Sequence, residues 1–181
     1  MDVSFNKDKK TADSLDWVRI IVFCFVVVIL LFAFVMRVVT VDGNSMNPTL
    51  SNQDKLVVSK LFYKPKYKDI VIVTQPNNLN KVLVKRIIAT EGQTIEFDTE
   101  KGVVIVNGVE LKEDYTLEPT YTAGHVKGKI VVPKGHVFVM GDNRNDSSDS
   151  RFNGIGCIDE RYILGKAYFR IWPFGSGFSL K

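Results

Sequence analysis

The sequence predicts a mostly β protein that begins with one apolar helix. Two observations lead to this fold class. No charged residue occurs between Ile20 and Met36, and β-branched residues dominate the rest of the chain, where no long segment keeps the 3.6-residue period of a helix. With 181 residues, the chain has room for the helix and for one β domain that buries a core without disulfides or metals.

The apolar stretch is long enough to be a transmembrane anchor. At ~1.5 Å per residue, residues 20–36 make roughly 25 Å of helix, which just spans a bilayer. Trp17 adds an interfacial ring, and Arg19 and Arg37 stand at the two ends. A cleaved secretory signal is the alternative, but residues 37–42 lack a small-x-small cleavage site. We therefore expect a disordered cytosolic tail at 1–16, an uncleaved anchor at 17–36 and a β domain at 37–181.

The basic residues on the two sides of the anchor predict its orientation. Those on the amino side are Lys7, Lys9, Lys10 and Arg19. On the carboxyl side, only Arg37 precedes Lys55. By the positive-inside rule, the N-terminus stays in the cytosol and the β domain is extracytoplasmic, so we expect a single-pass protein of the cell membrane.

The β domain is expected to consist of short strands. Asn107-Gly108 between two apolar runs is a signal for a two-residue hairpin, and we expect that hairpin to be a short insert within residues 90–133. Residues 159–164 are interpreted as one short helix. The expected strands cover residues 37–41, 55–59, 70–74, 82–88, 94–97, 103–106, 130–132, 136–140 and 167–172.

Composition and motifs argue against several functional classes. The formal net charge of +4 could suit nucleic acid, but no helix-turn-helix, zinc-finger or RNP-like pattern accompanies it, so a membrane surface is the better partner. Cys24 lies inside the apolar stretch and Cys157 far outside it, which predicts no disulfide. Neither His-Glu-x-x-His nor paired cysteines occur, so we expect no metal and no cofactor.

Two segments leave contact with lipid open. A lysine cluster interleaved with apolar residues could rest on anionic headgroups, or it could be a solvated face. The aromatic residues of segment 172–178 could enter lipid, or they could close the β domain. The lysines of the cluster are Lys55, Lys60, Lys64, Lys66 and Lys68.

Ser45 is the candidate nucleophile of the chain. A serine hydroxyl is almost unreactive until a base takes its proton, and the usual base is histidine. His125 and His136 both lie in turn-like sequence rich in glycine and lysine. Lys85 is therefore the candidate base. Taken alone, Ser45 could be an ordinary turn serine and Lys85 a strand lysine that reaches into solvent.

A lysine base must be uncharged when it takes the proton. At a pKa of ~10.4, only about 0.04% of lysine amines are neutral at pH 7, whereas a pKa of about 8 gives ~10% at a cost of roughly 3 kcal/mol. The period of two on a strand puts Lys85 on one face with Leu83 and Ile87, and Arg86 on the other. Because the Arg86 charge points away, we expect desolvation to be the main cause of a lowered pKa.

Three segments together resemble the family of bacterial type I signal peptidases, which are membrane-anchored serine proteases that remove signal peptides from exported preproteins. The resemblance rests on Ser45-Met46-x-Pro48-Thr49-Leu50, on Lys85-Arg86-Ile87-Ile88-Ala89 with Gly92, and on Gly141-Asp142-Asn143 with Ser147-x-Asp149-Ser150-Arg151. Residues 68–73 are similar to a fourth family motif, with Lys68 where glycine is usual. The resemblance covers the anchor and nearly all of the rest, and it implies a β-barrel-like signal-peptidase/repressor-peptidase domain.

The resemblance implies a role for each matching residue. Ser45 would be the nucleophile and Lys85 the general base, with the Ser147 hydroxyl hydrogen-bonded to the lysine amine. Some family members carry a serine hydroxyl two residues before the nucleophile, but Gly43 stands here, so the Ser45 backbone N–H would share the oxyanion with another donor. The supporting residues would be the ion pair Asp149 and Arg151 and the structural neighbours Asp142 and Arg86.

The implied substrates are signal-peptide-bearing preproteins with alanine-like residues at the first and third positions before the scissile bond. We expect Val39, Val41, Leu83 and Val139 to line the apolar pockets for these side chains. The segment from Met36 to Ser45 spans at most ~28 Å, which confines the nucleophile near the bilayer. Lipid is thus a second expected partner, no nucleic acid is expected, and a contact with the protein-export translocon is left open.

Two other readings compete with preprotein cleavage. One uses the same Ser/Lys pair for self-cleavage, as repressor-type peptidases do, but Ala123-Gly124 is the only Ala-Gly pair and the anchor argues against it. The other is a catalytically silent, membrane-tethered β domain that binds exported peptides or lipid. The presence of Ser45, Lys85 and Ser147 argues against this second reading.

Overall fold

A computed structural model of the chain describes residues 3–74, 81–174 and 180. These residues form two compact units, Met1–Arg37 and Val38–Lys181. Part of the C-terminal aromatic segment, residues 175–178, lies outside the described residues. The fold is mostly β, as the sequence predicted.

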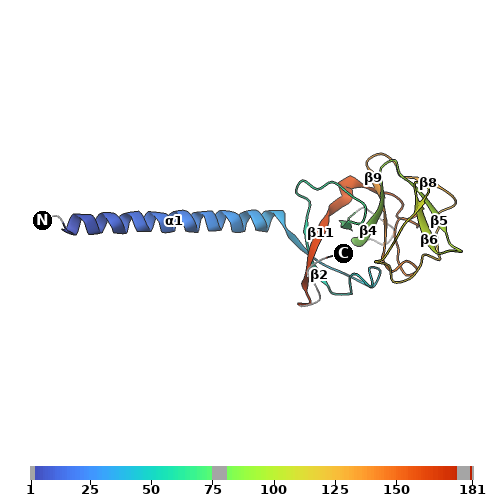
Figure 1. Cartoon of the computed structure of the whole chain (residues 1–181), viewed down its shortest axis with the longest axis horizontal. Helices are drawn as coiled ribbons and strands as arrows, with labels where there is room; N and C mark the ends of the chain where they lie inside the picture. The colour runs from blue at the N-terminus through green and yellow to red at the C-terminus, as the bar shows by residue number, and fades with distance from the viewer. Residues whose placement is uncertain (1–2, 75–80, 175–179, 181) are drawn as a thin grey trace. The chain divides into compact units, whose positions relative to one another are not determined.

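The first unit is the single helix α1, Val3–Val35 (Figure 1). The helix includes residues before Trp17, and the bounds expected for the tail and the anchor stay a prediction. Extending an existing helix adds one hydrogen bond per residue, so a polar segment beside a long apolar helix can join it without a new nucleus. Among the residues that the structure describes, no helix has the length and apolarity needed to cross a membrane.

A seven-stranded sheet is the body of the second unit. In spatial order its strands are β1 (Arg37–Thr40), β2 (Lys55–Ser59), β11 (Ile163–Trp172), β3 (Ile70–Val73), β4 (Leu83–Thr90), β9 (His136–Met140) and β10 (Ile158–Asp159). The long strand β11 pairs first with β3 and then with β2 and has register shifts on both sides. Such irregularities bend a strand, and the sheet curls accordingly (Figure 1).

The insert is a second sheet, which corrects the expectation of a single hairpin. It has four strands in the order β7 (Val109–Glu110), β6 (Val103–Val106), β5 (Thr94–Asp98) and β8 (Ile130–Val131). The expected Asn107-Gly108 turn does join β6 to β7, and both residues have the positive φ that this turn type requires, 52° and 79°. The sequence predicted a strand at 130–132 within the insert but not its pairing with β5, because that pairing is not local in the sequence.

The segment expected as a helix at 159–164 is shorter in the structure. Strand β10 ends at Asp159, the 3₁₀ turn η1 covers Glu160–Tyr162, and β11 begins at Ile163. The Asp159 side chain caps the turn by accepting a hydrogen bond from the Arg161 N–H at 2.8 Å. Ile163 is pulled into β11 because its side chain is buried in the core of the sheet.

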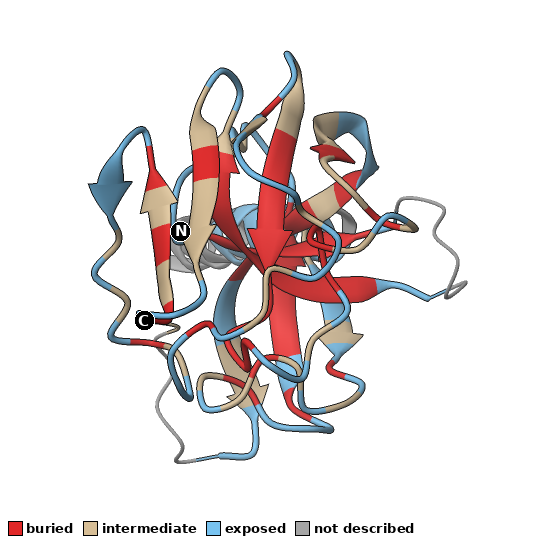
Figure 2. Cartoon of the chain, turned by 90° about the vertical axis from the view of Figure 1, so that its right-hand side faces the viewer, coloured by how far each residue is buried: buried red, intermediate tan, exposed pale blue. Residues whose placement is uncertain are grey.

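Both faces of the central strands are buried, as Figure 2 shows. Along β3, Ile70 and Ile72 belong to one apolar cluster and Val71 and Val73 to another. This division follows the period of two along a strand. A third cluster joins the two sheets, with Ile95 and Val104 of the insert packed against Phe138 of β9. The insert is therefore seated on the strands β4 and β9.

Phe138→Ala tests this junction. Phe138 is fully buried, and its ring lies 6.2 Å from the ring of Phe97 in β5. Removing the ring leaves a cavity, so the free energy of unfolding should fall by about 3–5 kcal/mol in urea denaturation. The matched control Val131→Ala, on an exposed position of β8, should change it by less than about 0.5 kcal/mol. Similar small losses in both variants would contradict the packing described here.

Candidate active site

Ser45 lies in a turn that the core holds in place. Met46 and Leu50 follow it in the sequence, and both side chains are fully buried in the cluster beneath the sheet. The Leu50 N–H donates to the Met46 carbonyl at 2.9 Å, and the Asn47 N–H donates to the Asn44 carbonyl at 3.0 Å. Two buried side chains and two local hydrogen bonds thus leave the partly exposed Ser45 with a defined orientation.

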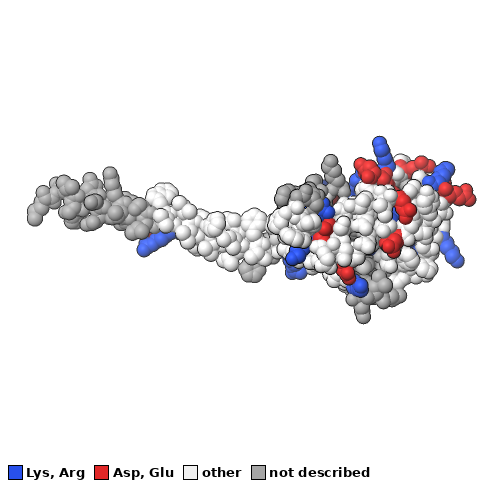
Figure 3. Space-filling view, turned by 90° about the horizontal axis from the view of Figure 1, so that it is seen from below, with Lys and Arg blue, Asp and Glu red and all other residues white. Residues whose placement is uncertain are grey.

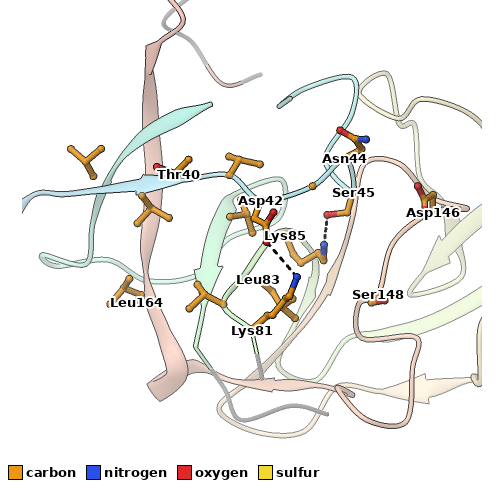
Figure 4. A pocket seen from close by; sticks show the side chains of 16 residues that line it. Thr40, Asp42, Asn44, Ser45, Lys81, Leu83, Lys85, Asp146, Ser148 and Leu164 are labelled. Atoms are coloured by element: carbon orange, nitrogen blue, oxygen red, sulfur yellow. Dashed lines mark hydrogen bonds and ion pairs between the residues drawn. The ribbon is translucent and has the colours of Figure 1, made fainter. Parts of the chain in front are cut away.

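Lys85 lies in the middle of β4 with its amine directed at Ser45, as Figure 4 shows. Its Nζ donates to the Ser45 Oγ at 2.5 Å. Only 3% of Lys85 is exposed, and desolvation lowers the pKa of its amine from 10.5 to about 8. This direction and its main cause match the expectation from the strand pattern, with Leu83 and Ile87 in the same apolar cluster.

The charges nearest Lys85 partly oppose one another. Asp149 raises the pKa of the Lys85 amine and Arg151 lowers it. These two residues form a buried ion pair in which Arg151 Nε and Nη2 each donate to Asp149 at 2.8 Å. Because Asp149 and Arg151 carry opposite charges, their effects on the pKa of the amine are of opposite sign. Desolvation remains the largest cause of the lowered pKa.

Arg86 points to the opposite side of β4 and ties three segments together. Its Nε and Nη2 donate to the two carboxylate oxygens of Asp142 at 2.8 and 2.6 Å, and both residues are buried. Thr49, from the turn that contains Ser45, donates to Asp142 at 2.6 Å. Arg86 Nη1 also donates to the Lys68 carbonyl at 2.9 Å. Lys68 has φ 71°, a left-handed conformation that favours glycine, so its side chain is accommodated there with backbone strain.

The loop 141–151 holds the Ser45 turn from the other side. The Asn143 N–H donates to the Ser45 carbonyl at 3.1 Å. Gly141 is packed so closely against the Ser45 carbonyl and the Ser147 side chain that a Cβ atom would collide with both. The Gly141 N–H in turn donates to Asp149 at 3.0 Å. Glycine at 141 therefore lets the loop approach the candidate nucleophile.

Ser147 does not make the hydrogen bond to the lysine amine that the resemblance implies. Its Oγ is buried and has no hydrogen-bond partner among the described residues. A buried hydroxyl without a partner costs about 1–3 kcal/mol, so such groups call for an explanation. Its position beside Gly141 keeps it close to the Ser45 carbonyl.

A groove of about 580 Å³ lies beside the Ser45–Lys85 pair (Figure 4). Three of the four expected pocket residues, Val39, Val41 and Leu83, line this groove. Val139 does not line it, and its side chain is fully buried in the core, where Val139 of β9 is paired with Ile87 of β4. Further lining residues that sequence reasoning missed include Val38, Val82, Leu164, Asp146 and Ser148.

Other contacts of the site also had no separate prediction. Thr49 and Asn143 stood inside the recognised motifs, so their presence was noted but not their bonds. Glu113 and Tyr115 come from the insert, where no sequence signal pointed to the site. No group of His, Cys, Asp and Glu side chains within the described part of the chain could hold a metal ion.

Comparison with known proteins shows which family the chain is similar to. Residues 14–172 match the family model described as Signal peptidase, peptidase S26. A probable signal peptidase I-1 of Synechocystis sp. is 39% identical over 159 residues, which cover 82% of this chain and 77% of that one. A signal peptidase I of Bacillus licheniformis is 36% identical over 169 residues, covering 88% and 89%.

Among solved structures, a signal peptidase I from Enterococcus faecalis V583 is 28% identical, with a TM-score of 0.45, covering 57% of this chain and 97% of that one. The family model spans most of the sequence, and relatives above 30% identity align over more than two thirds of both chains. The chain therefore belongs to the signal peptidase family, peptidase S26.

Proposed function

We propose that this protein is a membrane-bound serine endopeptidase that removes N-terminal signal peptides from exported preproteins, with Ser45 as nucleophile and Lys85 as general base. One observation carries the mechanism. It is the 2.5 Å hydrogen bond between the Lys85 amine and the Ser45 hydroxyl, at an amine that burial has already brought towards neutrality. The relatives named signal peptidase I support the substrate class.

The reaction is acyl transfer through a covalent intermediate. In the neutral-amine form, the Ser45 hydroxyl donates to Lys85 Nζ, which takes the proton as Ser45 Oγ attacks the scissile carbonyl. The resulting ammonium gives its proton to the leaving amine, which leaves an ester on Ser45. Water, deprotonated by Lys85, then attacks the ester; the bond to Ser45 Oγ breaks, the ammonium returns its proton to that oxygen, and the cleaved peptide leaves as a carboxylic acid.

Supporting groups stabilise the charges that develop. The Ser45 N–H is the donor that we assign to the oxyanion, since Gly43 has no side chain to contribute. We assign the buried Ser147 hydroxyl to orienting the lysine amine when substrate is bound. Its lack of a partner among the described residues is consistent with a group that bonds only during the reaction. The Asp149–Arg151 and Arg86–Asp142 pairs hold the loop and the strand in register.

The groove suits an extended peptide with small apolar residues. Among the described residues, strand β1 lies at an edge of its sheet, and such an edge can pair with a substrate strand. Val39, Val41 and Leu83 supply apolar walls beside Ser45. Such shallow walls accept alanine-like side chains, which fits the cleavage preference that the family resemblance implies.

We also propose that residues 17–36 anchor the chain in the cell membrane, with residues 1–16 in the cytosol and the catalytic domain outside it. The described side chains of α1 from Ile20 onward are apolar and largely exposed, and this stretch is free of charge in Figure 3. An apolar helix without a polar face needs an apolar environment such as lipid. Lipid would then hold enzyme and embedded signal peptide at the same height, which raises their effective concentration.

Replacing either member of the pair should abolish cleavage. We expect Ser45→Ala and Lys85→Met to lower the rate of cleavage of a labelled preprotein in detergent by at least about 10³-fold, because nucleophile and base act as a unit. The exposed residues Ser51 and Lys101 provide the controls Ser51→Ala and Lys101→Met, which should keep normal rates. Near-normal turnover by Lys85→Met would show that another group is the base.

The Lys85→Met variant also reports on burial, since it should be folded and more stable. The pKa of Lys85 is lower in the folded state, so the ammonium destabilises the fold by about 3 kcal/mol below pH 8, and this penalty fades between pH 8 and 10.5. Urea denaturation at pH 7 should therefore show a higher free energy of unfolding than wild type, with a smaller difference at pH 10. An unstable variant would mean that Lys85 is not a costly buried amine.

The cleavage rate should rise from neutral to alkaline pH. With the pKa of Lys85 at about 8, the active neutral amine makes up about 10% of molecules at pH 7 and about 90% at pH 9. The kcat/KM for a preprotein should increase by up to about ninefold over this range, with a midpoint near pH 8. A flat profile from pH 6 to 9 would exclude a titrating lysine base.

Protease protection tests the proposed topology. The full chain is tagged at each end and expressed in cells that have no outer membrane. When intact cells are treated with a protease, the chain should keep its N-terminal tag and lose its C-terminal domain. Recovery of the chain in the soluble fraction, or protection of the β domain until the cells are lysed, would contradict the anchor or its orientation.

A further inference from the structure

Residues 113–125 of the insert run along the catalytic loop 141–151, and we call this segment the brace. Contacts between the two are spread over their whole length. The Leu117 N–H donates to the Asp142 carbonyl at 3.1 Å, and the His125 N–H donates to the Arg151 carbonyl at 2.8 Å. Between them, Asn145 exchanges hydrogen bonds with Pro119 and Tyr121, each at 3.0 Å. The insert is thus bonded to the loop at both ends and in the middle.

Glu113 and Arg144 make the strongest of these contacts. Both carboxylate oxygens of Glu113 accept from Arg144, at 2.5 and 2.7 Å, and the Arg144 side chain is completely buried. Arg144 also donates to the Thr120 hydroxyl at 3.0 Å. A buried guanidinium without a carboxylate partner is strongly unfavourable, so the loop can keep Arg144 inside only while Glu113 is in place.

Arg144 in turn holds the backbone that touches the nucleophile turn. Its Nε donates to the Gly141 carbonyl at 3.0 Å. Gly141 packs against the Ser45 carbonyl and Ser147, and the adjoining Asn143 N–H is bonded to that same carbonyl. The route from the insert to the nucleophile therefore consists of one ion pair, one hydrogen bond and one close backbone contact.

Tyr115 gives the brace a second attachment. Its hydroxyl donates to Glu113 at 2.7 Å, and its ring lies 4.1 Å from the guanidinium of Arg86 and 5.7 Å from that of Arg144. The ring therefore lies beside Arg86, which is bonded to Asp142 of the loop, and beside Arg144, which belongs to the loop. Because Arg86 follows Lys85 in β4, this contact links the brace to the strand that carries the base as well.

We propose that Glu113, acting through Arg144, is a positioning residue of the active site, and that the brace keeps Ser45 within hydrogen-bond reach of Lys85. This inference rests on the proposed function. Glu113 touches neither substrate nor the reacting atoms. Its effect is to fix the loop 141–151 against the Ser45 turn, and a displacement of about 1 Å between reacting groups can cost on the order of 10²-fold in rate.

The first test compares Glu113→Gln with Glu118→Gln in the full chain in detergent. Glu118 is an exposed glutamate of the same segment and serves as the matched control. Glu113→Gln should lower kcat for a preprotein by at least about tenfold and change KM by much less, because the apolar groove residues Val39, Val41 and Leu83 lie outside the loop. Glu118→Gln should match wild type. A normal kcat per active site in Glu113→Gln would overturn the proposal.

The double variant Glu113→Leu/Arg144→Met separates positioning from stability. Replacing both partners of a buried ion pair by apolar residues of similar size often preserves stability. We expect a melting temperature close to that of wild type but a kcat that stays at least about tenfold low, because the Gly141 carbonyl has lost its donor. Full recovery of kcat together with stability would show that the pair only supports folding, and would overturn the proposal.

Hydrogen–deuterium exchange distinguishes failure of this inference from failure of the proposed function. In a Ser45→Ala background, Glu113→Gln should increase exchange in residues 43–50 and 141–151 but not in β2 or β3. This readout needs no substrate. If the wild-type chain cleaved no preprotein, the proposed function would be wrong. The exchange data would still test whether Glu113 orders the Ser45 turn and the loop 141–151. Unchanged exchange in both segments would overturn the brace.

Discussion

A desolvated amine within bonding distance of a hydroxyl is the interaction on which the rest of this structure depends. Lys85 is 3% exposed and its amine lies 2.5 Å from the Ser45 hydroxyl, and the proposed reaction rests on this contact. Burying that amine costs folding free energy, which the apolar clusters on both faces of the sheet must offset. The extensive core around a small site is thus part of its chemistry.

The buried arginines of the site are each paired with a carboxylate. Arg86, Arg144 and Arg151 are all buried, and each is bound in two-point contact by a carboxylate, Asp142, Glu113 and Asp149 respectively. A paired guanidinium and carboxylate perturb the amine with opposite signs, while their directional bonds hold the loop rigidly. These ion pairs therefore supply rigidity near the site without reversing the effect of desolvation on Lys85.

Sequence reasoning succeeded where the signal was local. The approximate positions of most strands, the Asn107-Gly108 hairpin and the opposite faces of Lys85 and Arg86 follow from alternation or turn chemistry within a few residues, although β11 begins four residues earlier than expected. It failed where the cause was distant. Val139 alternates like a pocket residue but belongs to a strand beyond β4. The helix expected at 159–164 is a 3₁₀ turn between β10 and β11, and the insert is a sheet because β8 returns to β5.

The sequence by itself indicated which residues carry the proposed chemistry, because the motifs around Ser45, Lys85 and residues 141–151 each occupy neighbouring positions in the chain. It also determined the apolar stretch that precedes them. Only the tertiary structure decided that Ser147 has no partner among the described residues and that Glu113 and Tyr115 reach the catalytic loop. The physical reason is that a buried charge needs an opposite charge beside it. The partner that packing supplies can be distant in the sequence, where no local pattern indicates the contact.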